Sequence, residues 1–173
     1  MVHQGEFMAR FLGRAHGLFQ GDFDACRGQI EPKVRASRVL VVGAAGSIGS
    51  CFVKQLMDLH PRGVCLVDPS ENNLVELVRD LRSSDAFIPD DFSTVAIALG
   101  TTMFDRFLAH TDPFEVVVNF AALKHVRSER DPFSTMRMIK TNILDLAQWL
   151  DHLEQKRPDH FFSVSSDKAV QPA

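Results

Sequence analysis

Three consecutive residues near the end of the chain carry the groups needed for acid–base chemistry. Ser166, Asp167 and Lys168 supply a hydroxyl, a carboxyl and an amine, and they follow an apolar run that predicts a β-strand. Such a trio can divide proton donation, proton removal and substrate orientation around one carbon atom. A capped turn with a solvent-exposed ion pair is the alternative, and the three residues alone do not separate the two interpretations.

A second group of chemically able side chains follows an earlier apolar run. Ala121 and Ala122 are small enough to let a ligand approach the backbone, and Lys124 and His125 add two titratable groups. Taken alone, the segment fits a ligand site and a loop of solvated charges equally well.

A glycine-rich loop, Gly43-Ala44-Ala45-Gly46-Ser47-Ile48-Gly49, lies between a predicted strand and a predicted helix. Glycines let the chain turn tightly and let a diphosphate reach N–H groups at the positive end of a helix, whereas Gly49 would allow close packing of helix on strand. The context favours dinucleotide binding over a structural turn, and the lack of Gly-Lys-Ser or Gly-Lys-Thr argues against a nucleoside-triphosphate loop. The expected cofactor-binding residues here are Gly43, Ala45, Gly46, Ser47, Ile48 and Gly49.

Asp68 ends the next predicted strand, about 25 residues after Gly43. A carboxylate at this position can accept hydrogen bonds from a ribose and repel a 2′-phosphate, which favours NAD over NADP. The same side chain could instead cap the following helix, which is expected to begin at Ser70.

The elements that must position these groups alternate along the chain. Apolar, β-branched runs predict strands at Arg38–Val42, Val64–Val67, Thr94–Leu99, Glu115–Phe120 and His160–Val164. Amphipathic segments predict helices at Ser47–Leu59, Ser70–Leu81, Met103–Ala109 and Pro132–Glu154, with Ile48 on the inner face of the first. This order predicts an α/β fold, a Rossmann-type parallel sheet of about five strands with helices on both faces. Ligands bind such sheets beyond the carboxyl ends of the strands, where the polar segments fall.

Residues 1–36 have a different pattern and predict an N-terminal helical extension, followed by a dinucleotide-binding domain over residues 37–173. Gly28 and Pro32 are expected to end any helix before the first strand. The apolar residues of the extension predict packing on the domain, with a membrane-surface or partner-binding helix as the alternative.

Composition excludes several function classes. The 173 residues are 45% hydrophobic and 24% charged, as in one soluble globular domain. A net charge of −3 without long blocks of one sign argues against nucleic acid as a partner. We find no apolar run near the roughly 18 residues of a membrane span and no secretory signal, so a cytoplasmic protein is expected. Cys26, Cys51 and Cys65 fit no metal or redox spacing, which predicts reduced, packed thiols and no metal site.

Several of these segments recur together, in one order, in a known family. They are the glycine loop, Asp68-Pro69-Ser70-Glu71-Asn72-Asn73-Leu74, Ala121-Ala122-Leu123-Lys124-His125-Val126, Thr141-Asn142 and Ser165-Ser166-Asp167-Lys168-Ala169-Val170-Gln171-Pro172. Over about residues 38–173 the chain resembles the nucleotide-sugar 4,6-dehydratases of polysaccharide biosynthesis, which are extended short-chain dehydrogenase/reductases. The Leu-Lys-His-Val and Ser-Asp-Lys-Ala-Val segments are more specific than the glycine loop.

The resemblance implies bound NAD or NADP and a UDP-linked N-acetylhexosamine as substrate. In the family, hydride leaves sugar C4 for the nicotinamide, water is lost across C5 and C6, and hydride returns at C6. Carried over to this chain, Lys168 would be the base at C5, Asp167 the acid for the C6 hydroxyl and Ser166 a hydrogen-bond partner of the sugar.

Further roles follow from the same resemblance. Ala121 and Ala122 would approach the cofactor, Lys124 and His125 would line the substrate side of the nicotinamide, and Asn142 would order the active site.

The chain departs from the family in two places. The family continues with a Tyr-x-x-x-Lys or Met-x-x-x-Lys segment and a substrate-binding region, whereas this sequence ends at Ala173 and contains no tyrosine. Gly100-Thr101-Thr102 stands where the family has a Gly-Asp-Val turn whose aspartate meets the adenine. We therefore expect a C-terminally truncated sheet, an incomplete catalytic site, and self-association through the exposed edge of the fifth strand.

The enzyme that the resemblance implies would perform dehydratase or epimerase chemistry on a nucleotide sugar, and two other functions stay open at this point. A dinucleotide-binding module without catalysis, acting as an interaction or regulatory subunit, would need only the glycine loop and Asp68. A methyltransferase that uses S-adenosylmethionine would share the sheet but would not explain Ser166-Asp167-Lys168.

Overall fold

The computed structural model describes residue 13 and residues 17–124 and 131–165. The chain forms two compact units, residues 1–33 and residues 34–173, and each is considered by itself. In the first unit Leu18, Phe19 and Phe23 are exposed. The other apolar residues of the predicted extension, Phe7, Met8, Phe11 and Leu12, lie outside the described residues.

Helix α2 spans Gln20–Ala36 and continues through Gly28 and Pro32, so the predicted helix end is wrong. Proline lacks the N–H that would bond to the carbonyl four residues earlier, here that of Gly28, and its ring crowds that carbonyl. A Cβ on Gly28 would meet nothing within 4 Å, so this turn is open and can absorb the distortion.

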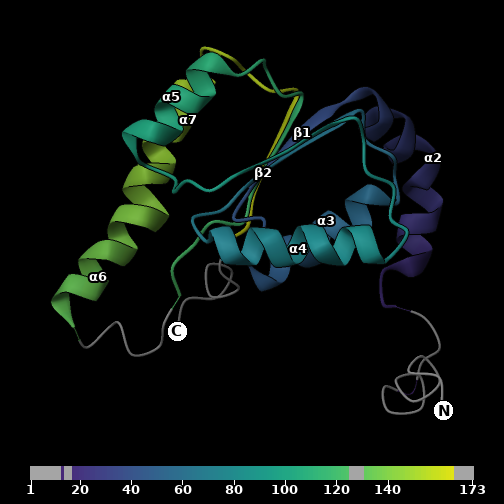
Figure 1. Ribbon diagram of the computed structural model, residues 1–173, viewed down its shortest axis with the longest axis horizontal. Coiled ribbons are helices and arrows are strands. Elements are labelled where there is room, and N and C mark those ends of the chain that lie inside the picture. Colours follow the sequence, from purple (N-terminus) through teal and green to yellow (C-terminus); the bar gives the residue numbers. More distant parts are fainter. Residues whose placement is uncertain (1–12, 14–16, 125–130, 166–173) are drawn as a thin grey trace. The chain divides into compact units, whose positions relative to one another are not determined.

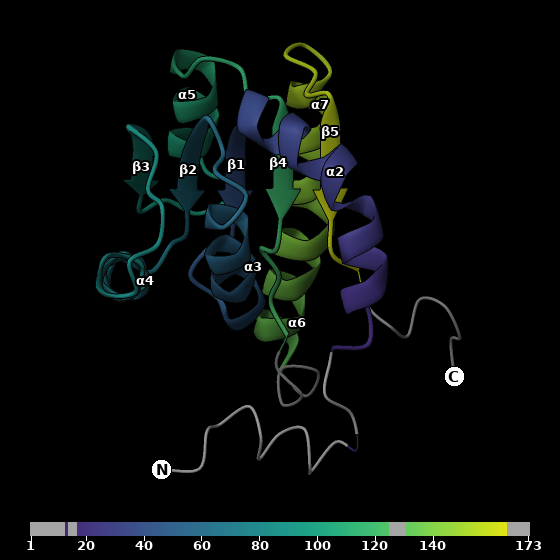
Figure 2. The same cartoon turned by 90° about the vertical axis from the view of Figure 1, so that its right-hand side faces the viewer.

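Five parallel strands form one sheet in the order β3-β2-β1-β4-β5, side by side in Figure 2. The strands are β1 (Arg38–Val42), β2 (Gly63–Val67), β3 (Asp91–Val95), β4 (Val116–Asn119) and β5 (His160–Ser163). The chain first builds from β1 toward β3 and then crosses to the other side of β1. The direction of the chain across the sheet therefore reverses between β1 and β4, and open α/β sheets bind ligands at the carboxyl ends of the strands at such a point.

Helices cover both faces of this sheet (Figure 1). The helices after β1 are α3 (Ser47–Met57), α4 (Glu71–Ser83), α5 (Thr102–His110), α6 (Pro132–Ile139), the π-helix η2 (Lys140–Leu144) and α7 (Asp145–Leu153). Val39 and Val41 of β1 pack with α3 and α4, whereas Leu40 and Val42 pack with Phe104 and Trp149 from α5 and α7. Alternate side chains of a strand point to opposite faces, so β1 contributes to two cores. The predicted Rossmann-type α/β fold is confirmed.

Three details differ from the sequence expectations. Strand β3 begins at Asp91 rather than Thr94, because Asp91 pairs with Gly63 and its carboxylate accepts a hydrogen bond from Arg38. Leu99, predicted to end this strand, lies beyond it and packs in the core under α5 and α7. Ile48 is 60% exposed instead of facing inward, and the long helical region contains the π-helix η2.

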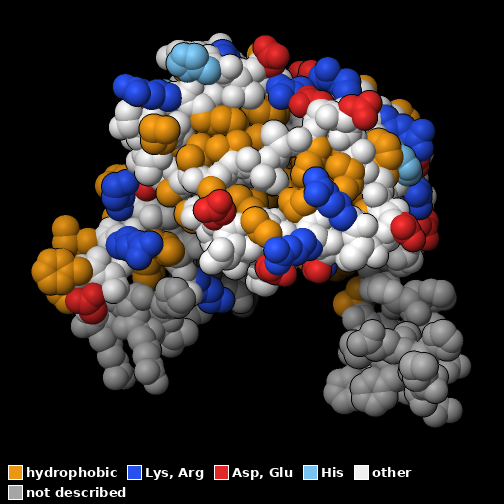
Figure 3. All heavy atoms as spheres, in the orientation of Figure 1, with side chains coloured by type: hydrophobic (Ala, Val, Ile, Leu, Met, Phe, Trp, Pro, Cys, Tyr) orange, Lys and Arg blue, Asp and Glu red, His pale blue; other side chains and the backbone are white. Residues whose placement is uncertain are grey.

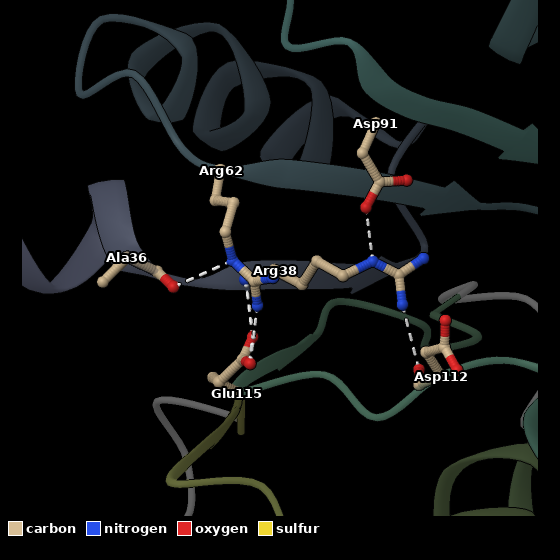
Figure 4. Close-up of polar contacts among 6 residues, drawn as sticks. All are labelled: Ala36, Arg38, Arg62, Asp91, Asp112 and Glu115. Carbon is tan, nitrogen blue, oxygen red and sulfur yellow. Dashed lines mark hydrogen bonds and ion pairs between the residues drawn. The ribbon is translucent and has the colours of Figure 1, made fainter.

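Two arginines connect the beginnings of four strands (Figure 4). The Arg38 guanidinium donates to Asp91 at 2.5 Å and to the Asp112 carbonyl at 3.0 Å, and Arg62 donates to Glu115 at 2.6 Å. The backbone N–H of Arg38 donates to the other Glu115 oxygen at 2.7 Å. Partial burial alone would raise the pKa of the Glu115 carboxyl, but the hydrogen bonds from Arg38, its own N–H and Arg62 outweigh this and lower it.

The expectation of packed thiols holds for one cysteine. Cys65 lies in β2 and is buried, and this burial raises the pKa of its thiol even though a hydrogen bond with Ser93 opposes the shift. Cys26 and Cys51 are exposed, and all three are free thiols.

Candidate functional site at the carboxyl ends of the strands

The glycine loop lies against the loop that follows β4. Gly43 has φ +76°, and a Cβ there would lie 2.5 Å from the backbone nitrogen of Ala121. Its own N–H donates to Val67 at 2.8 Å, which ties the loop to the end of β2. Only glycine fits both the left-handed backbone and this close approach. The loops after β1 and β4 are thus in contact where the chain direction across the sheet reverses.

The loop leads into an exposed helix N-terminus. Gly46 is the N-cap of α3 and offers no side-chain oxygen to the N–H groups of the first turn, and Gly46, Ser47 and Ile48 are exposed. A Cβ on Gly49 would collide with the carbonyl oxygen of Gly43, so this glycine lets the helix pack on the loop. Free N–H groups and the helix dipole suit an anionic group such as a diphosphate.

Asp68 is buried at the end of β2, and both of its carboxylate oxygens accept backbone hydrogen bonds. One accepts from Ala45 in the glycine loop at 3.1 Å and the other from Ser70 at 2.9 Å. The cap of α4 is Ser70, whose hydroxyl accepts from Asn73. Asp68 therefore supports the turn before this helix and also fixes a negative charge beside the glycine loop.

Asn119, at the end of β4, is a site residue that we did not predict from the sequence. It is buried, its oxygen accepts from Ala121 at 3.0 Å, and its amide donates to Ser163 of β5 at 3.1 Å. It holds the first of the two small residues in place beside Gly43. A polar residue that ends an otherwise apolar strand is the signal that could have identified it.

Asn142 lies in the π-helix and holds the loop after β4 through two hydrogen bonds. Its oxygen accepts from the N–H of Leu123 at 2.8 Å, and its amide donates to the Leu123 carbonyl at 2.9 Å. Lys124, the next residue of the loop, is exposed. The Asn142 side chain thus fixes the backbone next to Lys124, and both polar atoms are already engaged by that backbone.

Thr101 occupies the turn where the sequence departs from the resembled family. Its hydroxyl donates to Ala98 at 2.8 Å and accepts from Phe104 at 3.2 Å, which makes it the N-cap of α5. The hydroxyl of Thr101 therefore already uses its hydrogen-bond donor and one acceptor position within the protein.

The described part of the chain covers only some of the predicted site. The loop residues Gly43–Gly49, Asp68, Ala121, Ala122, Lys124 and Asn142 all lie at the carboxyl edge of the sheet. His125, Ser166, Asp167 and Lys168 lie outside the described residues. Among the residues described, no group of three or more His, Cys, Asp or Glu side chains could hold a metal ion, and no helix has the length and apolarity to cross a membrane.

Sequence comparisons match this chain to proteins of polysaccharide biosynthesis. Residues 39–173 match the family model described as "Polysaccharide biosynthesis protein". An uncharacterised membrane protein of Methanocaldococcus jannaschii is 32% identical over 78% of this chain and 37% of its own length. The probable polysaccharide biosynthesis protein EpsC of Bacillus subtilis is 27% identical over 84% of this chain and 24% of its own length. The chain therefore spans about a quarter to two fifths of these relatives.

Solved structures share the fold. The Bordetella bronchiseptica enzyme WbmF in complex with NAD⁺ is 20% identical, with a TM-score of 0.57 over 79% of this chain and 38% of its own. The UDP-glucose 4-epimerase of Thermotoga maritima, solved with UDP-glucose, is 27% identical, with a TM-score of 0.59 over 76% of this chain and 38% of its own.

Proposed function

The chain belongs to the polysaccharide biosynthesis protein family, and from this premise we propose that it binds a nicotinamide dinucleotide and acts in the modification of a nucleotide sugar. The observation that carries the proposal is the exposed N-terminus of α3 behind Gly43, which lies against Ala121 where the sheet direction reverses. The NAD⁺ complex of WbmF, a protein of the same fold, also supports it.

The described residues support three parts of such a cofactor site. The N-terminus of α3 would receive the diphosphate, Asp68 would face a ribose, and Ala121 and Ala122 would leave room for the nicotinamide end. When bound, the nicotinamide would supply hydride transfer, taking hydride from sugar C4 and returning it at C6. This chain's own contribution would be to bind, to orient and to move protons.

Calorimetric titration with NAD(H) tests the binding site, after absorbance and mass have shown that no nucleotide was purified with the protein. The informative pair is Gly46→Asp and Gly46→Asn, which have the same shape and differ in charge. A Cβ at Gly46 would make only an ordinary contact, 3.5 Å from the carbonyl oxygen of Gly43, and both residues are good N-caps. We expect both variants to fold, and Gly46→Asp to bind NAD(H) much more weakly than Gly46→Asn, because its carboxylate would repel the diphosphate.

Two results would contradict this assignment. Wild-type protein with a cooperative melting transition and no saturable binding would mean that the described site does not hold the nucleotide. Equal affinity of the Asp and Asn variants would place the nucleotide elsewhere on the protein.

We propose NAD rather than NADP as the cofactor, on the basis of Asp68. Its buried carboxylate is held by two backbone N–H groups, so its negative charge cannot easily turn away from a 2′-phosphate. The wild-type chain should bind NAD more tightly than NADP, and Asp68→Asn should narrow that difference. A wild-type preference for NADP would exclude this role.

The proposed sugar chemistry is the loss of water across C5 and C6 of a UDP-linked N-acetylhexosamine after oxidation at C4. Lys168 would remove the C5 proton, which the neighbouring C4 carbonyl acidifies, and Asp167 would protonate the departing C6 hydroxyl so that it leaves as water. Ser166 would hold a sugar hydroxyl. The UDP-glucose complex of the T. maritima epimerase supports a nucleotide-sugar substrate.

A single-turnover assay tests these roles, with mass spectrometry detecting the product that has lost one water. We expect Lys168→Gln and Asp167→Asn to lower the rate by about 10²-fold or more, the usual size of acid–base contributions. Lys54→Gln is the matched control, since Lys54 is an exposed residue of α3 that pairs with Asp80. No product from wild-type protein that binds NAD(H) would favour the non-catalytic binding module.

A further inference from the structure

The π-helix η2 joins two loops of the proposed site. It spans Lys140–Leu144 between α6 and α7 and carries Asn142, which holds Leu123 in the loop after β4. Asp145 follows immediately and begins α7. Short π-helical turns inside α-helices occur often at functional sites, because the extra residue redirects the side chains on either side.

Asp145 supports the turn that follows β3. Asp145 is 5% exposed. A Cβ on Gly100 would collide with the Asp145 carboxyl group. Gly100 also has φ +73°, so this turn needs glycine for its backbone conformation and for the space that Asp145 occupies. Gly100 is followed by Thr101, the N-cap of α5, so Asp145 lies against the end of the loop that connects β3 to α5.

Lys140 and Asp145 are joined across the π-helix. The Lys140 ammonium donates to Asp145 at 2.5 Å, with side-chain exposures of 57% and 6%. The two residues are five positions apart, one more than the four that place side chains on the same face of an α-helix. The ion pair therefore fits the π-helical turn and fixes it between Asn142 and the Gly100 turn.

We propose that Lys140 and Asp145 are positioning residues of the dinucleotide site. Their ion pair holds the π-helix in the register at which Asn142 meets Leu123 and Asp145 meets Gly100. One element thereby sets the loops after β3 and β4, which both lie at the carboxyl edge of the sheet. This inference rests on the proposed function, because it takes both loops to be part of the site that binds the dinucleotide.

Four variants test the proposal by two independent measurements. Asp145→Asn, Lys140→Met, the double variant and Lys140→Arg are compared in calorimetric titration with NADH and in hydrogen exchange of the Leu123 amide without nucleotide. The Leu123 N–H donates to Asn142, so its exchange rate reports whether the π-helix still holds the loop. Lys54→Met is the control, because it removes an exposed lysine from an ion pair between α3 and α4.

We expect each single variant to weaken NADH binding about threefold to tenfold, in the lower part of the range of coupling energies between contacting residues. The double variant should bind no more weakly than the worse single variant, because both changes break one pair. Hydrogen exchange at the Leu123 amide should be faster in the two single variants and in the double variant. Lys140→Arg keeps the positive charge and should retain both the NADH affinity and the protection of this amide. The control Lys54→Met should match the wild type in both measurements. The double variant leaves no unpaired buried charge and Lys140→Arg keeps the ion pair, so these two variants should fold even where a single variant that breaks the pair does not.

Two failures can be told apart. NADH affinity within twofold of wild type together with unchanged exchange at Leu123 in Lys140→Met would overturn the positioning role. If the wild-type protein binds no nicotinamide dinucleotide at all, the proposed function fails, whereas the exchange measurement still decides whether the ion pair holds the loop.

Discussion

Three glycines spaced three residues apart face different surroundings at the start of α3. Gly43 has a left-handed backbone against Ala121, Gly49 lies against the Gly43 carbonyl, and Gly46 has room around its Cα. The sequence pattern predicted the loop and the packing role of Gly49. It could not show that Gly43 meets the loop after β4, because that contact depends on the pairing of β1 with β4.

Gly49→Ala and Gly46→Ala form a matched test of these surroundings. The added methyl group at Gly49 would meet backbone atoms of Gly43 and Ala44, so we expect a loss of about 1–3 kcal/mol in the free energy of unfolding, typical of overpacking. Gly46→Ala should cost less than about 1 kcal/mol, the effect of a poorer N-cap. Urea denaturation measures both, and equal losses would show that the loop does not pack as described.

Side chains that act over long sequence distances were the least predictable part of the site. Asn119 donates to Ser163 and Asp145 lies against Gly100, and both contacts follow from the fold and from no local motif. Ile48 was assigned inward from helical periodicity, but it lies in the first turn of α3, beyond the edge of the core, and is exposed. Residue type identified the candidate chemistry, and tertiary structure decided which of these residues touch one another.

At the scale of the elements, periodicity predicted four strands well and the third poorly. The apolar run toward Leu99 predicted a strand at Thr94–Leu99, whereas β3 begins at Asp91 and ends at Val95. Strand β3 is at an edge of the sheet and its residues are half-buried or exposed. The strand therefore does not need a run of apolar residues, which is the pattern used to predict buried strands. The π-helix was missed for a related reason, because one additional residue in a long amphipathic segment changes its periodicity only slightly.

The contact of Glu115 with the starts of β1 and β2 predicts a pH-dependent stability. A carboxyl whose pKa is lowered on folding contributes stability above its unfolded pKa, near 4.5, and loses it as the pH falls through the folded value. We expect Glu115→Gln to be less stable than wild type at pH 7, with the difference shrinking below about pH 4.5. Thermal unfolding across this range measures it.

Glu76→Gln is the control for this titration. Glu76 pairs with Arg79 within α4, and both side chains are exposed, so this ion pair should contribute little to stability. A Glu115→Gln variant whose deficit stayed constant from neutral to acid pH would show that the carboxylate charge is not what joins the strands.

At the scale of the whole molecule, apolar side chains gather along one side of α6 and η2. Phe133, Met136, Ile139 and Ile143 recur at helical spacing and are 80%, 66%, 47% and 59% exposed. In Figure 3 hydrophobic side chains form a prominent group at the α6 end of the molecule. Exposed apolar surface of this kind usually marks an interface.

If a second copy of the chain covers this side of α6, the two copies should associate reversibly. Sedimentation velocity should show concentration-dependent dimers, and Met136→Gln should shift the equilibrium toward monomer because it removes apolar area from the contact. Val75→Gln on α4, where a single apolar side chain is exposed, is the control. A wild-type monomer at all concentrations would exclude this association and the earlier expectation drawn from the edge strand.

The position of β1 in the centre of the sheet has a consequence for synthesis. β1 is the first strand of the sheet to leave the ribosome, and β2 can pair with one of its edges soon afterwards. Its other edge must wait for β4, since Arg38 bonds to Glu115 across 77 residues. During that interval the nascent protein carries an apolar strand with an open edge, the period in which a chaperone would protect it best.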